Sequence, residues 1–243
     1  MEVLIYLLIG MSSFFFVLVP VSGGIILNPL LSLIIEPHVA ISLTVFFFTI
    51  NSSIKATIFR RDIVWKYVFL MLPLSAATAV IGTFVIGVVP EVMLYVMMLL
   101  MTLFFALKKI TPSLFKKKQS GHKQRAGFML TSTMSGFMQG TGLGGGGSLR
   151  KVYFLSENLT LQQMHGTTST LSVVLGTVST IIRLQTDQVT LEVLTPILYL
   201  IPIMIISTIF GKKVLLKLSE RTSDIIIKFT LVLTIAFLSL KLL

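Results

Sequence analysis

A glycine-rich stretch, residues 136–151, holds the residues whose types and spacing best suit binding chemistry. It reads GFMQGTGLGGGGSLRK, and four consecutive glycines, Gly144, Gly145, Gly146 and Gly147, interrupt an apolar region. Each glycine inside a helix costs about 1 kcal/mol relative to alanine, so four in a row predict a helix break. A break frees backbone N–H and C=O groups, and the missing Cβ atoms let a ligand approach the backbone closely.

The residues around this break favour an anion as the ligand. A new helix that starts near Ser148 would direct its free N–H groups and the positive end of its dipole at the break. Ser148 adds a hydroxyl donor, and Gln139 and Thr141 lie on the approach. Arg150 can form two parallel hydrogen bonds with an oxyanion. Arg150 and Lys151 could instead serve only to set the membrane topology.

The first half of the chain contains a weaker copy of this break. Gly23 and Gly24 are followed by Asn28 and Pro29, all within an apolar region. Paired helix breaks, one in each half of a membrane protein, are typical of a central substrate site. We therefore expect the site to lie between the two breaks, near the middle of the bilayer.

The helix expected after each break carries polar residues. Thr44 and Asn51 lie in the first of these helices, and Thr167 and Thr168 lie in the second. Hydroxyls in membrane helices often bond to their own backbone or to a neighbouring helix, which explains most of them. Asn51, and Lys55 one turn further on, are costlier to bury and could line a pathway, although Lys55 could equally extend to the inner membrane surface.

The elements that must position these residues are membrane helices. Of the 243 residues, 54% are hydrophobic and only 12% are charged, about half the charged fraction of a soluble domain. The apolar runs are about 20 residues long, which is the length that crosses a bilayer. Basic cytoplasmic loops explain the net charge of +11 better than nucleic-acid binding does. The absence of cysteine excludes disulfides, thiolate metal sites and cysteine nucleophiles.

The chain is expected to divide into a first membrane repeat at 1–110, a basic cytoplasmic linker at 111–126 and a second membrane repeat at 127–243. The stretch from Lys108 to Arg125 contains seven basic residues and no acid, which is typical of a cytoplasmic loop. The outermost hydrophobic segments are expected at about 3–19 and 223–242.

The two halves resemble each other at a constant separation. The second glycine break follows the first by 123 positions. Three pairs of identical residues have the same separation: Thr44 with Thr167, Arg60 with Arg183, and Pro73 with Pro196. Internal repeats of this kind are common in transporters.

The basic residues favour an inverted arrangement of the halves. If the broken first segment of each half folds back as a hairpin, each half crosses the membrane three times and both termini lie outside. Only Arg183 and Lys241 are then misplaced under the positive-inside rule, whereas four full crossings per half misplace six basic residues.

Residues for enzymatic chemistry are not grouped in the sequence. His38, His122 and His165 lie in three separate regions, and their spacing suggests neither a metal site nor a catalytic triad. We expect no catalytic residue, no metal and no cofactor.

The chain resembles the sulfite exporter TauE/SafE-like family of membrane transporters. The resemblance rests on a glycine-rich break, a proline and an A-x-x-T-S-like helix start in each half. Here these are GGIILNPL at 23–30 and PHVAISLT at 37–44, then GLGGGG at 142–147 and HGTT at 165–168, with Lys151 where the family usually shows proline. The resemblance implies secondary transport, typically export, of sulfite, organosulfonates or similar sulfur-containing anions.

We therefore expect an all-α polytopic bundle of two inverted repeats, each opening with a broken helix or re-entrant hairpin, in the plasma or inner membrane. Its expected function is export of a small anion. Coupling to a proton or another ion is left open, and so is a homo-oligomeric state. Nucleic acid is not expected as a partner. The candidate substrate-binding residues are Gly23, Gly24, Asn28, Thr44, Asn51, Gln139, Thr141, Gly144, Gly145, Gly146, Gly147, Ser148, Arg150, Thr167 and Thr168.

An alternative function remains open at this point. Gly136, Gly140 and Gly144 are spaced by four and would line one helix face, where glycines permit close helix packing. A membrane assembly or binding protein that does not transport would use them in this way.

The inverted arrangement predicts that the carboxyl terminus lies outside the cell. A reporter protein that is active only in the cytoplasm should be inactive when fused after Leu243, and active when inserted beside Ser120 in the basic linker. Cytoplasmic activity of the carboxyl-terminal fusion would contradict the inverted arrangement.

Overall fold

The computed structural model describes residues 23–110, 124–215, 235 and 239, and the regular elements of this part are all helices. In chain order they are α2 (Gly24–Ser32), α3 (Pro37–Ile58), η1 (Arg60–Asp62), α4 (Trp65–Val88), α5 (Glu91–Ile110), α6 (Gln124–Thr141), α7 (Gly146–Ser156), α8 (Leu161–Gln185), α9 (Leu191–Leu194), η4 (Thr195–Leu200) and α10 (Ile201–Leu215). Four spans of the described part are long and apolar enough to cross a membrane: α3, α4, α8 and the run Leu191–Phe210. The predicted all-α polytopic fold is confirmed.

Several predictions concern residues outside the described part of the chain. These are the hydrophobic segments at 3–19 and 223–242, the linker residues 111–123, and both termini. The boundaries of the two repeats therefore stay predictions.

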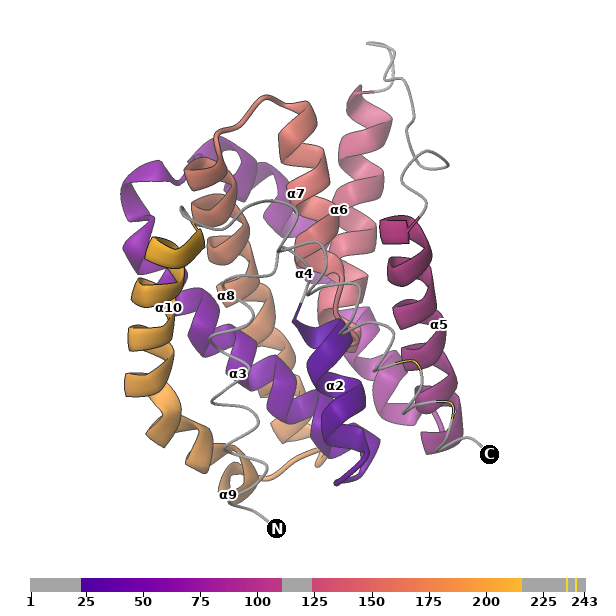
Figure 1. Ribbon diagram of the computed structural model, residues 1–243. Helices are drawn as coiled ribbons and strands as arrows, with labels where there is room; N and C mark the ends of the chain where they lie inside the picture. The colour runs from indigo at the N-terminus through magenta and orange to yellow at the C-terminus, as the bar shows by residue number, and fades with distance from the viewer. Residues whose placement is uncertain (1–22, 111–123, 216–234, 236–238, 240–243) are drawn as a thin grey trace.

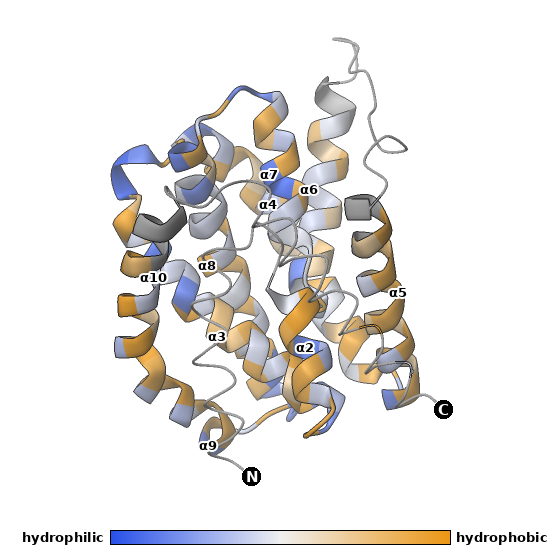
Figure 2. Cartoon of the chain, viewed as in Figure 1, coloured by the Kyte–Doolittle hydropathy of each residue, from blue (hydrophilic) through white to orange (hydrophobic). Residues whose placement is uncertain are grey.

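The outer faces of the bundle are apolar. Large side chains such as Phe69 of α4, Leu100 of α5 and Ile206 of α10 are 60% to 67% exposed. In Figure 2, α5 and α10 lie on opposite sides of the bundle and are mostly hydrophobic, whereas α6 and α8 between them are paler. A surface of this kind suits hydrocarbon rather than water, so it places lipid against α4, α5 and α10.

Helices α6 and α7 form a hairpin around the second glycine break (Figure 1). The ring of Tyr153 near the end of α7 packs against Phe128 near the start of α6, with ring centroids 6.0 Å apart. At the other end of the pair, a Cβ on Gly146 would lie 2.5 Å from the carbonyl oxygen of Ser135 and 3.3 Å from the amide of Gln139. The two helices therefore run antiparallel, and the chain turns back at the break instead of continuing across the membrane.

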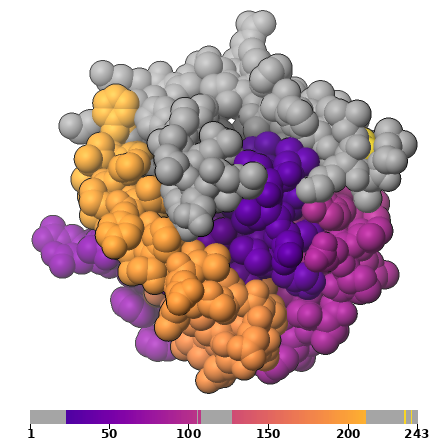
Figure 3. Space-filling view, turned by 90° about the horizontal axis from the view of Figure 1, so that it is seen from below, coloured from indigo at the N-terminus to yellow at the C-terminus, as the bar shows by residue number. Residues whose placement is uncertain are grey.

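Helices α2 and α7 extend in opposite directions from the two breaks (Figure 1). The backbone oxygen of Ser32, at the end of α2, accepts a hydrogen bond of 3.0 Å from Tyr95 in the first half of α5. Near the end of α7, Tyr153 packs against Tyr67, in the first turn of α4. Because α4 and α5 begin at opposite ends of the bundle, α2 and α7 point to opposite membrane surfaces. Seen from below, α2 lies between α9–α10 on one side and α5 on the other (Figure 3).

The helix boundaries of the first half of the chain recur in the second half, 123 positions later. α2 corresponds to α7, α3 to α8, and α4 to the run from α9 to α10, each to within four residues. This recurrence and the opposite directions of α2 and α7 are features that an inverted repeat would have, and the repeat itself stays a prediction.

Helices α4 and α6 pack with their backbones in contact. A Cβ on Gly136 would collide with the backbone of Ser75, and a Cβ on Gly140 would collide with that of Ala79. The Ser75 hydroxyl also donates a hydrogen bond of 2.9 Å to the carbonyl of Ser132. Small residues thus allow a close approach that van der Waals packing and polar contacts stabilise inside the membrane.

Gly140→Ala should destabilise the bundle by about 1–3 kcal/mol, because the added methyl group forces α4 and α6 apart. Thermal unfolding of the purified protein measures the effect. Gly127→Ala is the matched control on the same helix, since no atom lies within 4 Å of its added Cβ, and it should be neutral or stabilise by about 0.5–1 kcal/mol. Equal midpoints for the two variants would show that the close approach is not required.

Candidate functional site

The two glycine breaks touch each other. A Cβ on Gly24 would lie 3.2 Å from the Cα of Gly144, and one on Gly144 would lie 2.7 Å from the amide nitrogen of Ile25. Gly142, Gly144 and Gly145 have φ values of 74°, 96° and 90°, which residues with a Cβ rarely adopt. Glycine is therefore required here both for the turn of the chain and for the contact between the halves.

Two buried polar side chains hold the second break. Asn28 of α2 donates a hydrogen bond of 2.7 Å from Nδ2 to the carbonyl oxygen of Gly142. Arg183 of α8 donates from Nη2 to the carbonyl oxygens of Gly140 and Thr141, at 3.0 and 3.1 Å. These carbonyls end α6 and have no partner within the helix, so a cation at this helix end satisfies them and suits the dipole.

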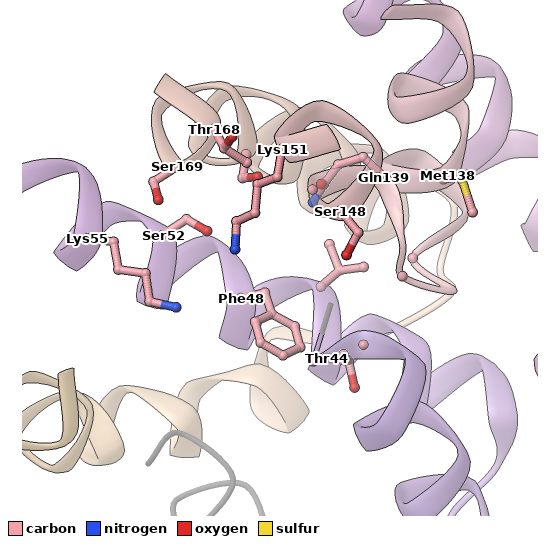
Figure 4. A pocket seen from close by; sticks show the side chains of 18 of the residues that line it. Thr44, Phe48, Ser52, Lys55, Met138, Gln139, Ser148, Lys151, Thr168 and Ser169 are labelled. Carbon is pink, nitrogen blue, oxygen red and sulfur yellow. The ribbon is translucent and has the colours of Figure 1, made fainter. Parts of the chain in front are cut away.

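A cavity of about 110 Å³ lies beside the paired breaks (Figure 4). On the scale where one water needs roughly 10–15 Å³, it can hold several waters or a small polyatomic ion. Its lining residues are Gly23, Gly24, Thr44, Val45, Phe48, Ser52, Lys55, Met138, Gln139, Gly142, Gly144, Gly146, Gly147, Ser148, Lys151, His165, Thr168, Ser169 and Ser172.

The cavity is lined by cations and hydrogen-bond donors. Lys55 of α3 and Lys151 of α7 extend their amines into it from different sides (Figure 4), and no Asp or Glu is among its described lining residues. The hydroxyls of Thr44 and Thr168 are buried and have no hydrogen-bond partner in the described structure. The arrangement therefore offers positive charge and unused donors to an anion.

The amino-terminal end of α7 borders the same cavity. Gly146, Gly147 and Ser148 belong to its lining, and the N–H groups of a first helical turn have no acceptor within the helix. A Cβ on Gly147 would meet only Thr168 Cγ2 at 3.7 Å and Arg150 Nη2 at 4.0 Å. Gly147 therefore leaves the backbone accessible from the cavity, which is the arrangement expected for anion binding at a helix start.

Several predicted site residues come together at this cavity, although no contact with a substrate tests them. They are Gly23, Gly24, Thr44, Gln139, Gly144, Gly146, Gly147, Ser148 and Thr168. Arg150 lies behind them and does not line the cavity. Its guanidinium is fully buried, and Nη2 donates to Gln139 Oε1 at 3.0 Å and to Ser172 Oγ at 2.7 Å.

The remaining predicted residues lie outside the lining and have other contacts. Asn28 holds Gly142, and Thr141 donates its hydroxyl to the carbonyl of Met138 at 3.1 Å. Thr167 accepts a hydrogen bond from the Val64 amide at 3.0 Å. Asn51 accepts one from Thr208 of α10 at 3.5 Å, and Gly145 is the residue before the first turn of α7.

Sequence reasoning did not place Lys151 in the site, although helical spacing would have done so. In a helix that starts at Gly146, Lys151 follows Ser148 by three positions and Gly147 by four, so the three share one face. On α3, Thr44, Phe48, Ser52 and Lys55 are likewise spaced by four, four and three, and all line the cavity.

The family described as Sulfite exporter TauE/SafE matches residues 5–242, nearly the whole chain. The chain belongs to this family. No curated protein and no solved structure matches the chain.

Members of the TauE/SafE family are membrane transporters and not enzymes, so the cavity of this TauE/SafE chain is a candidate transport site. It lies beside the contact between the two breaks. A small sulfur-containing anion is the class of substrate that the family implies.

Arg183→Ala should destabilise the protein by about 3 kcal/mol or more, because it leaves the final carbonyls of α6 unpaired inside the membrane. Arg60→Ala is the matched control: Arg60 lies 123 positions earlier, is exposed, and its removal should change stability by less than about 0.5 kcal/mol. Thermal unfolding in one detergent compares the two variants, and equal losses would refute the role assigned to Arg183.

Proposed function

We propose that this TauE/SafE protein is a secondary transporter that exports sulfite or a closely related sulfur oxyanion across the cell membrane. The observation that carries the proposal is the cavity beside the paired glycine breaks, where Lys55, Lys151 and the start of α7 converge without an acidic residue in the described lining. Cations and the N–H groups of Gly146 and Gly147 around one small space favour an oxyanion over a cation or an apolar solute.

The distribution of exposed charge supports a cytoplasmic linker. Exposed Arg60, Arg61 and Lys66 lie at the end of the bundle where α5 stops and α6 starts (Figure 1). The opposite end carries four exposed acids and no exposed base among the described residues: Glu36, Glu91, Asp187 and Glu192. Arg183, which the charge rule counts as misplaced, is buried at 1% exposure and so is a packing residue. By the positive-inside rule the basic end faces the cytoplasm.

The cavity extends from the breaks toward this basic end. Thr44 lies near the contact of the breaks, whereas Lys55 is in the last turn of α3 and His165 is near the start of α8. Both of these helix ends lie on the basic side of the bundle (Figure 1). A cavity in the cytoplasmic half suits loading of an anion from inside the cell, and the family name gives export as the direction.

The contacts of individual glycines separate packing from transport. Gly136 and Gly140 serve packing of α6 against α4, as the assembly alternative supposes. Gly144 lies beyond the end of α6 and contacts α2 instead. Gly147 borders the cavity with no close packing contact. Packing therefore does not account for all the glycines, and the family assignment favours transport.

Gly147→Leu should reduce sulfite flux by about tenfold or more, because the side chain would occupy the cavity and cover the start of α7. The measurement is efflux of sulfite from liposomes that contain the purified protein. Gly127→Leu, in open space on α6, is the control and should leave flux unchanged.

Both variants should elute from size exclusion as the wild type does, so that a loss of flux is not a loss of fold. Wild-type protein that moves neither sulfite nor another sulfur oxyanion would overturn the proposed function.

A further inference from the structure

We infer that Lys55 and Lys151 act as a pair that selects compact oxyanions of charge −2 over monovalent sulfonates and over zwitterionic aminosulfonates. The inference rests on the proposed function and specifies the charge of its substrate. Neither lysine is needed to hold the fold together through a described hydrogen bond or ion pair, which leaves a role toward a ligand.

The two lysines approach the cavity from separate helices. Lys55 is in the last turn of α3, and Lys151 is in the second turn of α7. Both amines point into the space between these helices (Figure 4), and both lysines line the same cavity. His165 of α8 is the third titratable group in the described lining. An anion between the two amines replaces their repulsion by two attractions.

No acidic group offsets these charges in the described part of the cavity. Arg150 adds a third cation immediately behind the lining, and its Nε and Nη1 are buried without a hydrogen-bond partner. Cations held out of water without a counter-ion are costly. A dianion compensates both lysines at once, whereas a monoanion leaves one of them uncompensated.

The neutral groups of the cavity also suit a ligand rich in oxygen atoms. The hydroxyls of Thr44 and Thr168 have no partner in the described structure and can donate, as can the N–H groups of Gly146 and Gly147 at the start of α7. The ammonium group of an aminosulfonate would find no carboxylate here and would be repelled by both lysines. Rejection of zwitterions would thus come from repulsion, which is a common source of specificity.

Equilibrium binding to the purified full-length protein tests the pair. The probes are thiosulfate and sulfate as dianions, methanesulfonate as a monoanion and taurine as a zwitterion, at one ionic strength and at a mildly acidic pH at which all four keep these charges. Wild type should bind at least one dianion about tenfold or more tightly than methanesulfonate, with taurine weakest. Lys151→Gln and Lys55→Gln should each bring the ratio of dianion to monoanion affinity toward one.

Two further variants control for charge and for folding. Lys151→Arg keeps the charge and should keep a preference for dianions, while Lys66→Gln removes an exposed lysine outside the cavity and should leave all affinities unchanged. A wild-type ratio near one, or a ratio that both Lys→Gln variants preserve, overturns the inference.

The outcomes separate this inference from the proposed function. Sulfite flux accompanied by equal affinity for thiosulfate and methanesulfonate would leave the transporter intact and refute selection by charge. Absence of binding and of flux for every sulfur anion would refute both.

Discussion

The structure depends on satisfying backbone polar groups where two helices break inside a membrane. The hydrocarbon core of the bilayer contains no water that could hydrogen-bond a free carbonyl or N–H group, so the protein itself must supply the partner. Here the second break is completed by other parts of the chain: Asn28 of α2 bonds the carbonyl of Gly142, and Arg183 of α8 bonds the last carbonyls of α6. The second break is stabilised because it contacts the start of α2 and because α8 brings a buried guanidinium to it.

This constraint also explains the position of the cavity. The carbonyl end of α6 is closed by Arg183, but the N–H end of α7 faces the lining through Gly146, Gly147 and Ser148. At this turn the carbonyl end of α6 is thus used for folding, whereas the N–H end of α7 is left for a ligand. Lys55 and Lys151 reinforce the positive character of the open end, while Arg150, held by Gln139 and Ser172, reinforces it from behind.

Much of the fold was predictable because it follows from local composition. Long apolar runs predict membrane helices, and consecutive glycines predict the breaks and the new helix at α7. The sequence interpretation named Arg150 and not Lys151 as a candidate ligand, because a guanidinium is in general the better oxyanion ligand. The structure places Lys151 in the cavity lining and Arg150 buried behind it. Asn28 and Arg183 could not be assigned, since their partners lie 114 and 42–43 positions away. Such contacts depend on how helices pack, which no local pattern reports.

The acid-free lining has an energetic consequence for the transport cycle. A carboxylate in the site could carry a proton or metal cation along with the anion and cancel its charge, but the described lining holds none. An oxyanion that crossed without a coupled cation would move its full charge through the membrane field, which is worth about 2.3 kcal/mol per charge at 100 mV. In a cell whose interior is negative, that voltage pushes anions outward. For a dianion the work doubles, so the resting potential alone would favour expulsion over uptake by several orders of magnitude in concentration ratio.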